Sequence, residues 1–107
     1  MQHISEVKGR AIVPGLYGRF VHGEHMTVSH VTIDKGSVMA VHSHPHEQVT
    51  FILEGELEMT IGGEKMLLKK GCIHVIPSNV PHGAVAHVDC VVLDVFNPVR
   101  EDYVIKG

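Results

Sequence analysis

The chain has 107 residues and a mass of 11.7 kDa, with 44% hydrophobic and 20% charged residues, which is typical of one soluble domain with a single core. The formal charge is −3, and the lysines are scattered except at Lys69 and Lys70, so we expect no nucleic-acid partner. No apolar stretch approaches the roughly 20 residues that cross a bilayer, and residues 1–9 carry no apolar signal region. We therefore expect no membrane partner and a cytoplasmic location.

Short tracts rich in Val, Ile and Thr predict an all-β chain. In chain order, we expect strands over residues 27–33, 49–53, 57–61, 66–68, 73–76 and 91–96. Turn-forming residues separate these tracts, and the Gly62-Gly63 pair predicts a tight hairpin. Because no window keeps a helical period and turn signals recur about every 8 to 12 residues, we expect one sandwich or barrel over residues 1–107.

The two cysteines, Cys72 and Cys90, lie in apolar sequence without the spacing of a zinc or redox motif. We expect both to be buried free thiols. Neither is predicted to take part in the chemistry.

Histidine is the compositional outlier, because the chain has ten and three of them, His42, His44 and His46, fall within five residues. On a strand, side chains two apart share a face, so His42 and His44 are expected to point the same way. If the chain resumes in phase after the proline that interrupts the strand, Gln48 is the next polar side chain on that inner face. His82 follows a second proline. Donors of this kind suit a divalent metal such as Mn, Fe, Ni, Cu or Zn, and hold calcium or magnesium poorly.

Asp94 lies inside a continuous apolar tract over residues 91–96, where a buried carboxylate is costly unless it is paired or used. Asp94 and Phe96 share a face and are expected to project together into the interior. Arg100 follows the strand and can fold back over its end, where a planar guanidinium suits a carboxylate. The structural alternative is that Asp94 only holds a core histidine or Arg100 in a salt bridge. Tyr103 is expected to pack and pin the C-terminus.

The spacing of these residues resembles the cupin family. The first cupin motif, over residues 36–55, is matched by Gly36, His42, His44, Gln48 and Gly55, with the glutamine in place of an acidic residue. The second motif, over residues 71–86, is matched by Gly71, Pro77 and His82, with Asn79 replacing a glycine and Ala86 the final asparagine. The resemblance implies a small double-sheet jelly roll, the cupin double-stranded β-helix, which pairs as a homodimer. It also implies one divalent transition metal in the mouth of the barrel, bound by His42, His44, Gln48 and His82.

A neutral amide ligand leaves the full charge of a divalent ion available to polarise a bound oxygen. The site is therefore expected to be a stronger Lewis acid than one with a carboxylate ligand. It is also expected to hold its metal more weakly.

Residues 94–103, the histidine run and the turn before His82 are similar to one branch of this family, the unsaturated pyranuronate lyases of the KdgF type. The similarity runs over about residues 17–103. In that branch the residues equivalent to Asp94, Phe96 and Arg100 are catalytic or contact the substrate. The resemblance implies metal-dependent ring opening of 4,5-unsaturated uronate monosaccharides to linear 5-keto-4-deoxyuronate in pectin or alginate catabolism.

Four side chains near this candidate site keep open roles. His46 could lie behind a ligand, at the rim or in solvent, and we favour solvent. Glu47 has the opposite parity to Gln48 and is expected in a salt bridge or behind a ligand, although a bulge would let the two exchange roles. Tyr17 and Arg19 could complete a carboxylate pocket or form a plain surface pair.

Two other classes of function compete with a uronate enzyme. One is a non-catalytic, metal-bearing module that binds a small acid or sugar. The other is a cupin dioxygenase, since this fold hosts oxygenases as well. Gln48 argues mildly against the dioxygenase, because such sites usually retain a glutamate.

Overall fold

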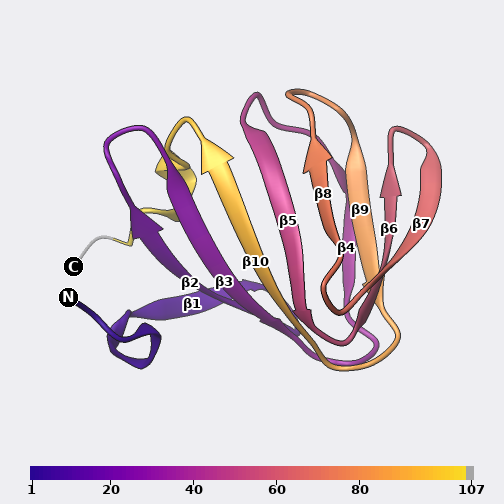
Figure 1. The fold of residues 1–107 in the computed structure, drawn as a ribbon, viewed down its shortest axis with the longest axis horizontal. Helices are drawn as coiled ribbons and strands as arrows, with labels where there is room; N and C mark the ends of the chain where they lie inside the picture. Colours follow the sequence, from indigo (N-terminus) through magenta and orange to yellow (C-terminus); the bar gives the residue numbers. More distant parts are fainter. Residues whose placement is uncertain (106–107) are drawn as a thin grey trace.

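The structure is a computed structural model, and it describes residues 1–105. Within that part, two antiparallel sheets make a jelly roll, and single turns of 3₁₀-helix, η1 (Ile4–Glu6) and η2 (Glu101–Tyr103), lie near the ends (Figure 1). The six-stranded sheet has the order β1-β2-β3-β10-β5-β8, and the four-stranded sheet has the order β4-β9-β6-β7. The strands are β1 (Gly9–Val13), β2 (Leu16–His22), β3 (Thr27–Ile33), β4 (Val38–His42), β5 (Glu47–Glu54), β6 (Glu56–Ile61), β7 (Glu64–Lys69), β8 (Ile73–Ile76), β9 (His82–Ala86) and β10 (Cys90–Asn97).

The all-β fold class and each of the predicted strands are confirmed, with β3 and β8 matching the expected bounds. The six expected ranges leave out β1, β2, β4 and β9, and within β2 and β9 a glycine interrupts the apolar pattern. Gly18 in β2 is there for space, since a Cβ at this position would lie 2.6 Å from the ring of Phe20. A β-propensity argument cannot find such a strand, because the residue that weakens the local signal is required by the packing.

The turns follow the expected chemistry. Gly62 and Gly63 join β6 to β7 with φ values of +58° and +81°, so both adopt the left-handed conformation that a tight hairpin requires. Asn79, which replaces a glycine of the second cupin motif, also has a positive φ of +64°. The substitution therefore keeps the turn that leads into His82.

The inner face of the six-stranded sheet changes from apolar to polar along its strands. At the apolar level, Val92 on β10 pairs with Val31 and Ile52. Two residues further along β10, Asp94 lies opposite Ser29 on β3 and Thr50 on β5. The next step places Phe96 opposite Thr27 and Gln48. The buried core is Leu16, Val31, Ile33, Ile52, Leu57, Met59, Ile61, Leu68, Ile76, Ala86, Cys90 and Val92. A polar site thus sits on top of a continuous apolar core.

The structure corrects the expected position of the first histidine pair. His42 is the last residue of β4, and His44 follows in the loop, so the two do not alternate along one strand. The register of β4 against β9 shifts between Met39 and His42, which is the mark of a bulge. The bulge and the loop, rather than regular strand alternation, bring the two imidazoles together.

Both cysteines are free thiols, as expected, but they differ in burial. Cys90 lies in the core, with its Sγ 3.2 Å from the carbonyl oxygen of Glu56. Cys72 is exposed in the turn between β7 and β8, so the prediction of a buried thiol is wrong at this position.

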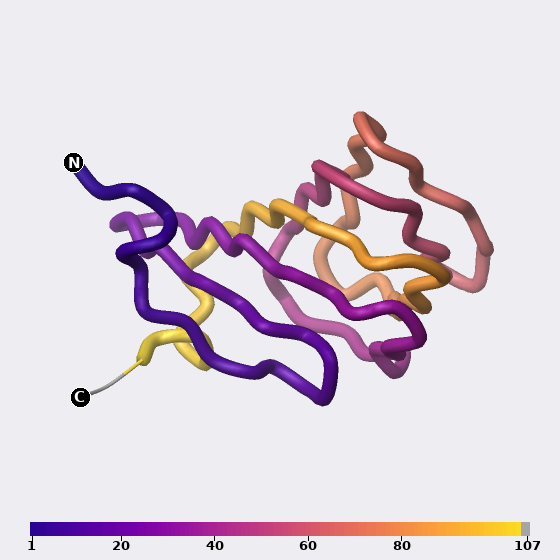
Figure 2. Tube along the Cα trace, turned by 90° about the horizontal axis from the view of Figure 1, so that it is seen from below, coloured from indigo at the N-terminus to yellow at the C-terminus, as the bar shows by residue number. Residues whose placement is uncertain are grey.

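The N-terminus and the last described residues, after η2, lie at the same side of the molecule, far from the hairpin of β6 and β7, as Figure 2 shows from a second direction. In the described residues 1–105, no helix has the length and apolar character needed to span a membrane. The expected site lies between these two regions, where β4, β5, β9 and β10 approach one another.

Candidate active site

Three histidines from two separate parts of the chain converge in the mouth of the barrel. His42 ends β4, His44 lies in the loop before β5, and His82 begins β9. Each offers a ligand atom, and these three atoms all lie within 4.8 Å of one another. The ring of His82 is 4.4 Å from that of His42 and 4.9 Å from that of His44, centroid to centroid. This spacing can hold one metal ion.

Backbone carbonyl groups fix the tautomer of all three imidazoles. The pairs of Nδ1 and carbonyl oxygen are His42 with Ala40 at 2.9 Å, His44 with His46 at 3.0 Å, and His82 with Val80 at 2.9 Å. A carbonyl oxygen can only accept, so Nδ1 of each neutral ring must carry the hydrogen. Each Nε2 therefore keeps a lone pair for a metal, in the arrangement common for metal-binding histidines.

Burial favours the neutral form of two of these rings, His44 and His82. Burial is the main cause that lowers the pKa of His44 and of His82, and the positive charge of Arg100 lowers both further. Imidazole binds metal through its neutral form. The electrostatics of the site thus keep these two imidazoles in the form that binds a metal at neutral pH.

Gln48 supplies the fourth donor, and its orientation is set by neighbours. Its side-chain Nε2 donates to Thr50 Oγ1 at 2.9 Å and to Asp94 Oδ1 at 3.2 Å. The opposite atom, Oε1, lies 3.1 Å from Nε2 of His44. Since that nitrogen carries no hydrogen, two lone pairs face each other, an arrangement that a shared cation would stabilise. The residues therefore fit a metal, and three imidazole nitrogens with an amide oxygen suit a divalent transition ion.

Glu47 does not exchange roles with Gln48. Its side chain is exposed, whereas Gln48, Thr50 and Ile52 are buried on the inner face of β5. The parity argument from the sequence is confirmed for this strand.

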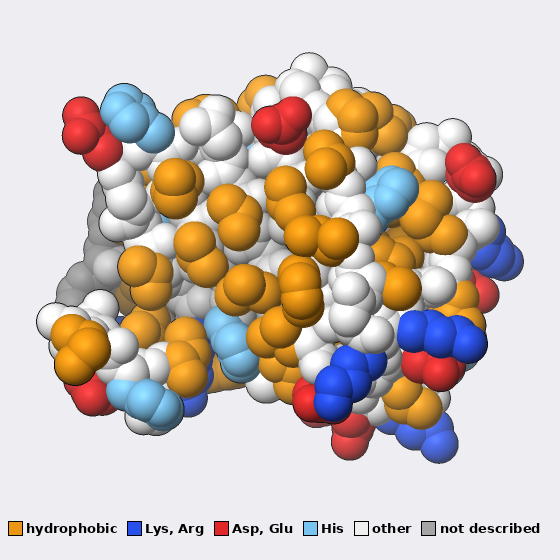
Figure 3. All heavy atoms as spheres, viewed as in Figure 1, with side chains coloured by type: hydrophobic (Ala, Val, Ile, Leu, Met, Phe, Trp, Pro, Cys, Tyr) orange, Lys and Arg blue, Asp and Glu red, His pale blue; other side chains and the backbone are white. Residues whose placement is uncertain are grey.

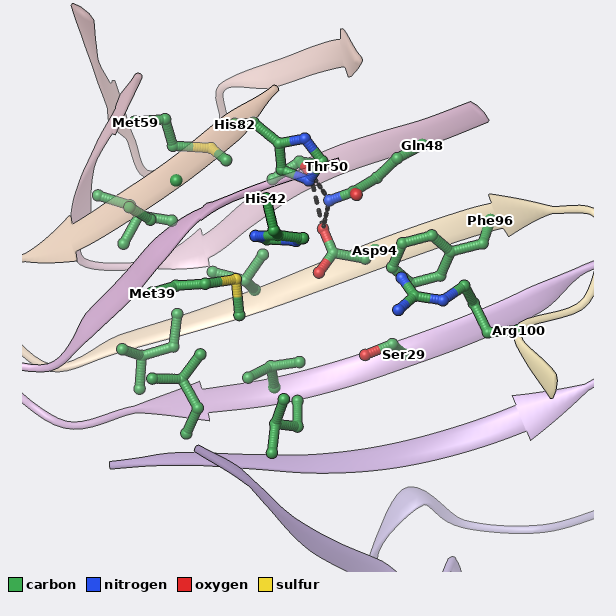
Figure 4. Close-up of a pocket in the computed structure, with 18 of the residues that line it drawn as sticks. Ser29, Met39, His42, Gln48, Thr50, Met59, His82, Asp94, Phe96 and Arg100 are labelled. Carbon is green, nitrogen blue, oxygen red and sulfur yellow. Dashed lines mark hydrogen bonds between the residues drawn. The ribbon is translucent and has the colours of Figure 1, made fainter. Parts of the chain in front are cut away.

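Asp94 is hydrogen-bonded but makes no salt bridge within the described residues. Its Oδ1 accepts from the hydroxyl of Thr50 at 2.7 Å as well as from the amide of Gln48 (Figure 4). Burial raises the pKa of Asp94 to about 6, and these hydrogen bonds only partly oppose the effect. A carboxyl group of this kind exchanges a proton near neutral pH. The alternative, in which Asp94 only holds a histidine or Arg100, is wrong in this structure.

Arg100 lies in the same cavity but is held differently from the expectation. Its guanidinium carbon lies 4.7 Å from the ring centre of Phe96 and 4.1 Å from that of Tyr103. Asp102 accepts from Nε at 3.0 Å and from Nη2 at 2.8 Å. One edge of the planar fork is thus occupied by a residue that the sequence analysis did not assign, although it follows Arg100 by two positions. Nη1 takes no part in this pair.

Tyr103 packs as expected. Its ring stacks on Phe20 at 4.4 Å and meets Phe96 edge-on at 5.9 Å. It therefore packs the segment after β10 against the sheet, and together with Phe96 it makes the aromatic contacts of the Arg100 guanidinium.

Of the side chains with open roles, His46 differs from its favoured assignment, whereas Tyr17 and Arg19 follow one of the two expected readings. His46 is half-buried, with its ring 5.4 Å from His44 and a buried Nδ1 that has no partner in residues 1–105, so the solvent assignment is wrong. Tyr17 and Arg19 lie on the outer side of β2, and Arg19 donates to the carbonyl oxygen of Val7 at 2.6 Å. They form a surface pair, not part of the pocket.

The cavity joins the histidines to the acid and the guanidinium. His42, Gln48, His82, Asp94 and Arg100 all line it, and Phe96 forms part of its wall (Figure 4). Its deeper wall is apolar, with the side chains of Leu16, Val31, Ile33, Met39, Leu57, Met59 and Val92. A cavity with a polar mouth and an apolar floor is suited to a small ligand whose polar groups contact the residues at the mouth.

Comparison with known proteins agrees with this geometry. The cupin-domain family model matches residues 29–96, which include His42, His44, Gln48, His82 and Asp94. The pectin degradation protein KdgF of Dickeya dadantii is 35% identical over 71 residues, which are 64% of this chain and 64% of that protein.

Solved structures extend the match over almost the whole chain. KdgF from Halomonas sp. has a TM-score of 0.87 and 32% identity, covering 94% of each chain. An RmlC-like cupin from Shewanella frigidimarina has a TM-score of 0.92 and 30% identity, covering 97% of this chain and 95% of that one. With this fold, this histidine cluster and these matches, the chain belongs to the cupin family.

Proposed function

We propose that this cupin opens the ring of 4,5-unsaturated uronate monosaccharides to give linear 5-keto-4-deoxyuronate during pectin or alginate breakdown. The observation that carries the proposal is Asp94, a carboxyl group with a pKa of about 6 in the same cavity as the histidine cluster and a buried guanidinium. The similarity to KdgF proteins, one of them named for pectin degradation, supports the choice of substrate.

The proposed reaction is an isomerisation in which atoms are conserved. The anomeric hydroxyl loses its proton, the C1–O5 bond breaks as the C1 carbonyl forms, and the electron pair moves onto O5 as an enolate. A proton added at C4 then turns the enolate into the 5-keto group. One group that takes a proton and returns it can serve both steps, which is general acid–base catalysis.

Asp94 is the group on this chain that suits the proton transfers. Thr50 and Gln48 hold its Oδ1, so the carboxyl group has a fixed orientation and its Oδ2 is the atom left to exchange a proton. A pKa near 6 lets the group both accept and donate a proton at neutral pH.

Arg100 and Phe96 are suited to position the substrate. The guanidinium carbon lies 4.7 Å from the ring centre of Phe96, and Asp102 accepts only from Nε and Nη2, so Nη1 can bind the substrate carboxylate. The ring of Phe96 offers an apolar surface beside the acid. A divalent ion, of Ni, Zn, Mn, Fe or Cu, bound by His42, His44, Gln48 and His82, would stabilise negative charge on substrate oxygens.

The test follows the loss of ultraviolet absorbance of an unsaturated uronate. We expect Asp94→Asn to lower kcat/KM about 10²- to 10⁴-fold, and Arg100→Ala to raise KM. The exposed variant Glu47→Gln is the matched control and should keep full activity. Because the ring also opens without a catalyst, rates are compared with a protein-free blank.

Each outcome is informative. Undiminished rates in both the Asp94 and Arg100 variants would reject these roles. Tight uronate binding without turnover would favour a non-catalytic binding module instead. Oxygen consumption with an aromatic substrate would favour a dioxygenase.

We also propose that two copies pair through the outer face of the six-stranded sheet. Across five strands this face carries an unbroken row of valines, Val21, Val28, Val95, Val49 and Val75. In Figure 3, hydrophobic side chains gather where Figure 1 has β10 and β5. The outer face of an antiparallel sheet is usually polar when it meets water. An uncharged row can meet its own copy about a two-fold axis without charge repulsion.

A further inference from the structure

Ser29 is a buried polar side chain that the fold leaves without a partner. Its residue is 1% exposed, and its hydroxyl makes no hydrogen bond within residues 1–105. A buried hydroxyl left without a hydrogen bond destabilises the folded chain. Because proteins rarely keep such a group without use, its surroundings indicate what it could bind.

The hydroxyl faces the cavity of the candidate active site. Ser29 lies on the inner face of β3, directly opposite Asp94 on β10, and lines the same cavity (Figure 4). Two residues away on the same face, Thr27 Oγ1 accepts from the backbone nitrogen of Arg100 at 2.9 Å. The strand β3 thus fixes the start of the Arg100 side chain and presents a hydroxyl between that cation and the acid.

The size of the cavity limits what can reach this hydroxyl. Its volume is about 50 Å³, and one water-sized group needs about 10–15 Å³. This enclosed space is small, and a compact polar group such as a carboxylate suits it. Ser29 and Arg100 both line this space, and a hydroxyl donor beside a guanidinium favours an anion.

We propose that Ser29 donates a hydrogen bond to the carboxylate of the uronate and shares that group with Arg100. The inference rests on the proposed function for the choice of a uronate. It adds a second hydrogen-bond donor for the substrate carboxylate, which lets the site distinguish a uronate from a neutral sugar of the same shape. Loss of a hydrogen bond to a charged group costs about 1.5–3 kcal/mol, which corresponds to about 10- to 150-fold in affinity.

The experiment measures binding by isothermal titration with two unreactive probes, galacturonate and galactose. Ser29→Ala should raise the Kd for galacturonate at least about tenfold and leave the Kd for galactose unchanged. The matched control is Ser43→Ala, an exposed serine, which should bind like the unaltered protein. Urea unfolding should find Ser29→Ala as stable as the unaltered protein or more so, because an unpaired hydroxyl is removed.

Three results would overturn the proposal that Ser29 binds the uronate carboxylate. These are an unchanged galacturonate Kd in Ser29→Ala, an equal loss of affinity for both sugars, and no galacturonate binding by the unaltered protein. Turnover of an unsaturated uronate is measured separately. Ser29-dependent binding without turnover would reject ring opening and support carboxylate binding by Ser29. Turnover with a normal KM in Ser29→Ala would support ring opening and reject carboxylate binding by Ser29.

Discussion

Asp94 should make the metal-free protein less stable as the pH rises, and Asp94→Asn should remove this effect. Burial raises the pKa of this carboxyl group from 3.8 to about 6 in the folded chain. A proton therefore binds the folded state more tightly than the unfolded one. The stabilisation is fully present below about pH 3.8 and is lost as the pH rises through about 6. At about 1.36 kcal/mol for each unit of pKa, the whole effect is about 3 kcal/mol, of which about half falls between pH 5 and pH 7.5.

The assay is urea unfolding of both metal-free proteins at a series of pH values across that range. The free energy of unfolding of the asparagine variant, relative to that of the unaltered protein, should grow as the pH rises. The lowered pKa values of His44 and His82 act in both proteins and cancel in the difference. Glu47→Gln, at an exposed position on β5, is the control and should differ from the unaltered protein by a constant amount. A constant difference for Asp94→Asn as well would refute the argument that burial controls this group.

Three further predictions concern the metal, the guanidinium and the sheet face. A chelator should abolish turnover. His82→Ala should weaken zinc binding, measured by isothermal titration, at least about tenfold. An affinity for zinc equal to that of the unaltered protein would show that His82 is not a ligand. Asp102→Asn should raise KM about tenfold with little change in kcat, because it loosens the fork of Arg100; a fall in kcat alone would contradict this role. Val95→Lys at the centre of the valine row should give a monomer by sedimentation analysis, whereas Val38→Lys, exposed on the other sheet, should not; a monomeric unaltered protein would rule the pairing out.

The sequence was sufficient to predict the fold and the residues that meet, but not how they meet. Strand β3 could be predicted to its ends because it is rich in Val, Ile and Thr and turn-forming residues follow it, and Gln48 could be placed inside by parity. The pairing of Arg100 with Asp102 could not be predicted, since it depends on the turn of η2 after the strand. The unpartnered hydroxyl of Ser29 carried no signal either, because a serine in a strand is ordinary until its neighbours are known.

The glutamine at position 48 has a reason that only the structure supplies. From the sequence, a neutral ligand matters because it leaves more charge on a metal. In the structure, the same amide also donates to Asp94 at 3.2 Å, which a glutamate could not do when ionised. A carboxylate at position 48 would also place a second negative charge beside Asp94 and oppose its ionisation further. One amide therefore serves both halves of the site, offering its oxygen towards the histidines and its nitrogen to the acid. In the proposed metal site, a glutamine at this position would couple metal binding to the orientation of Asp94.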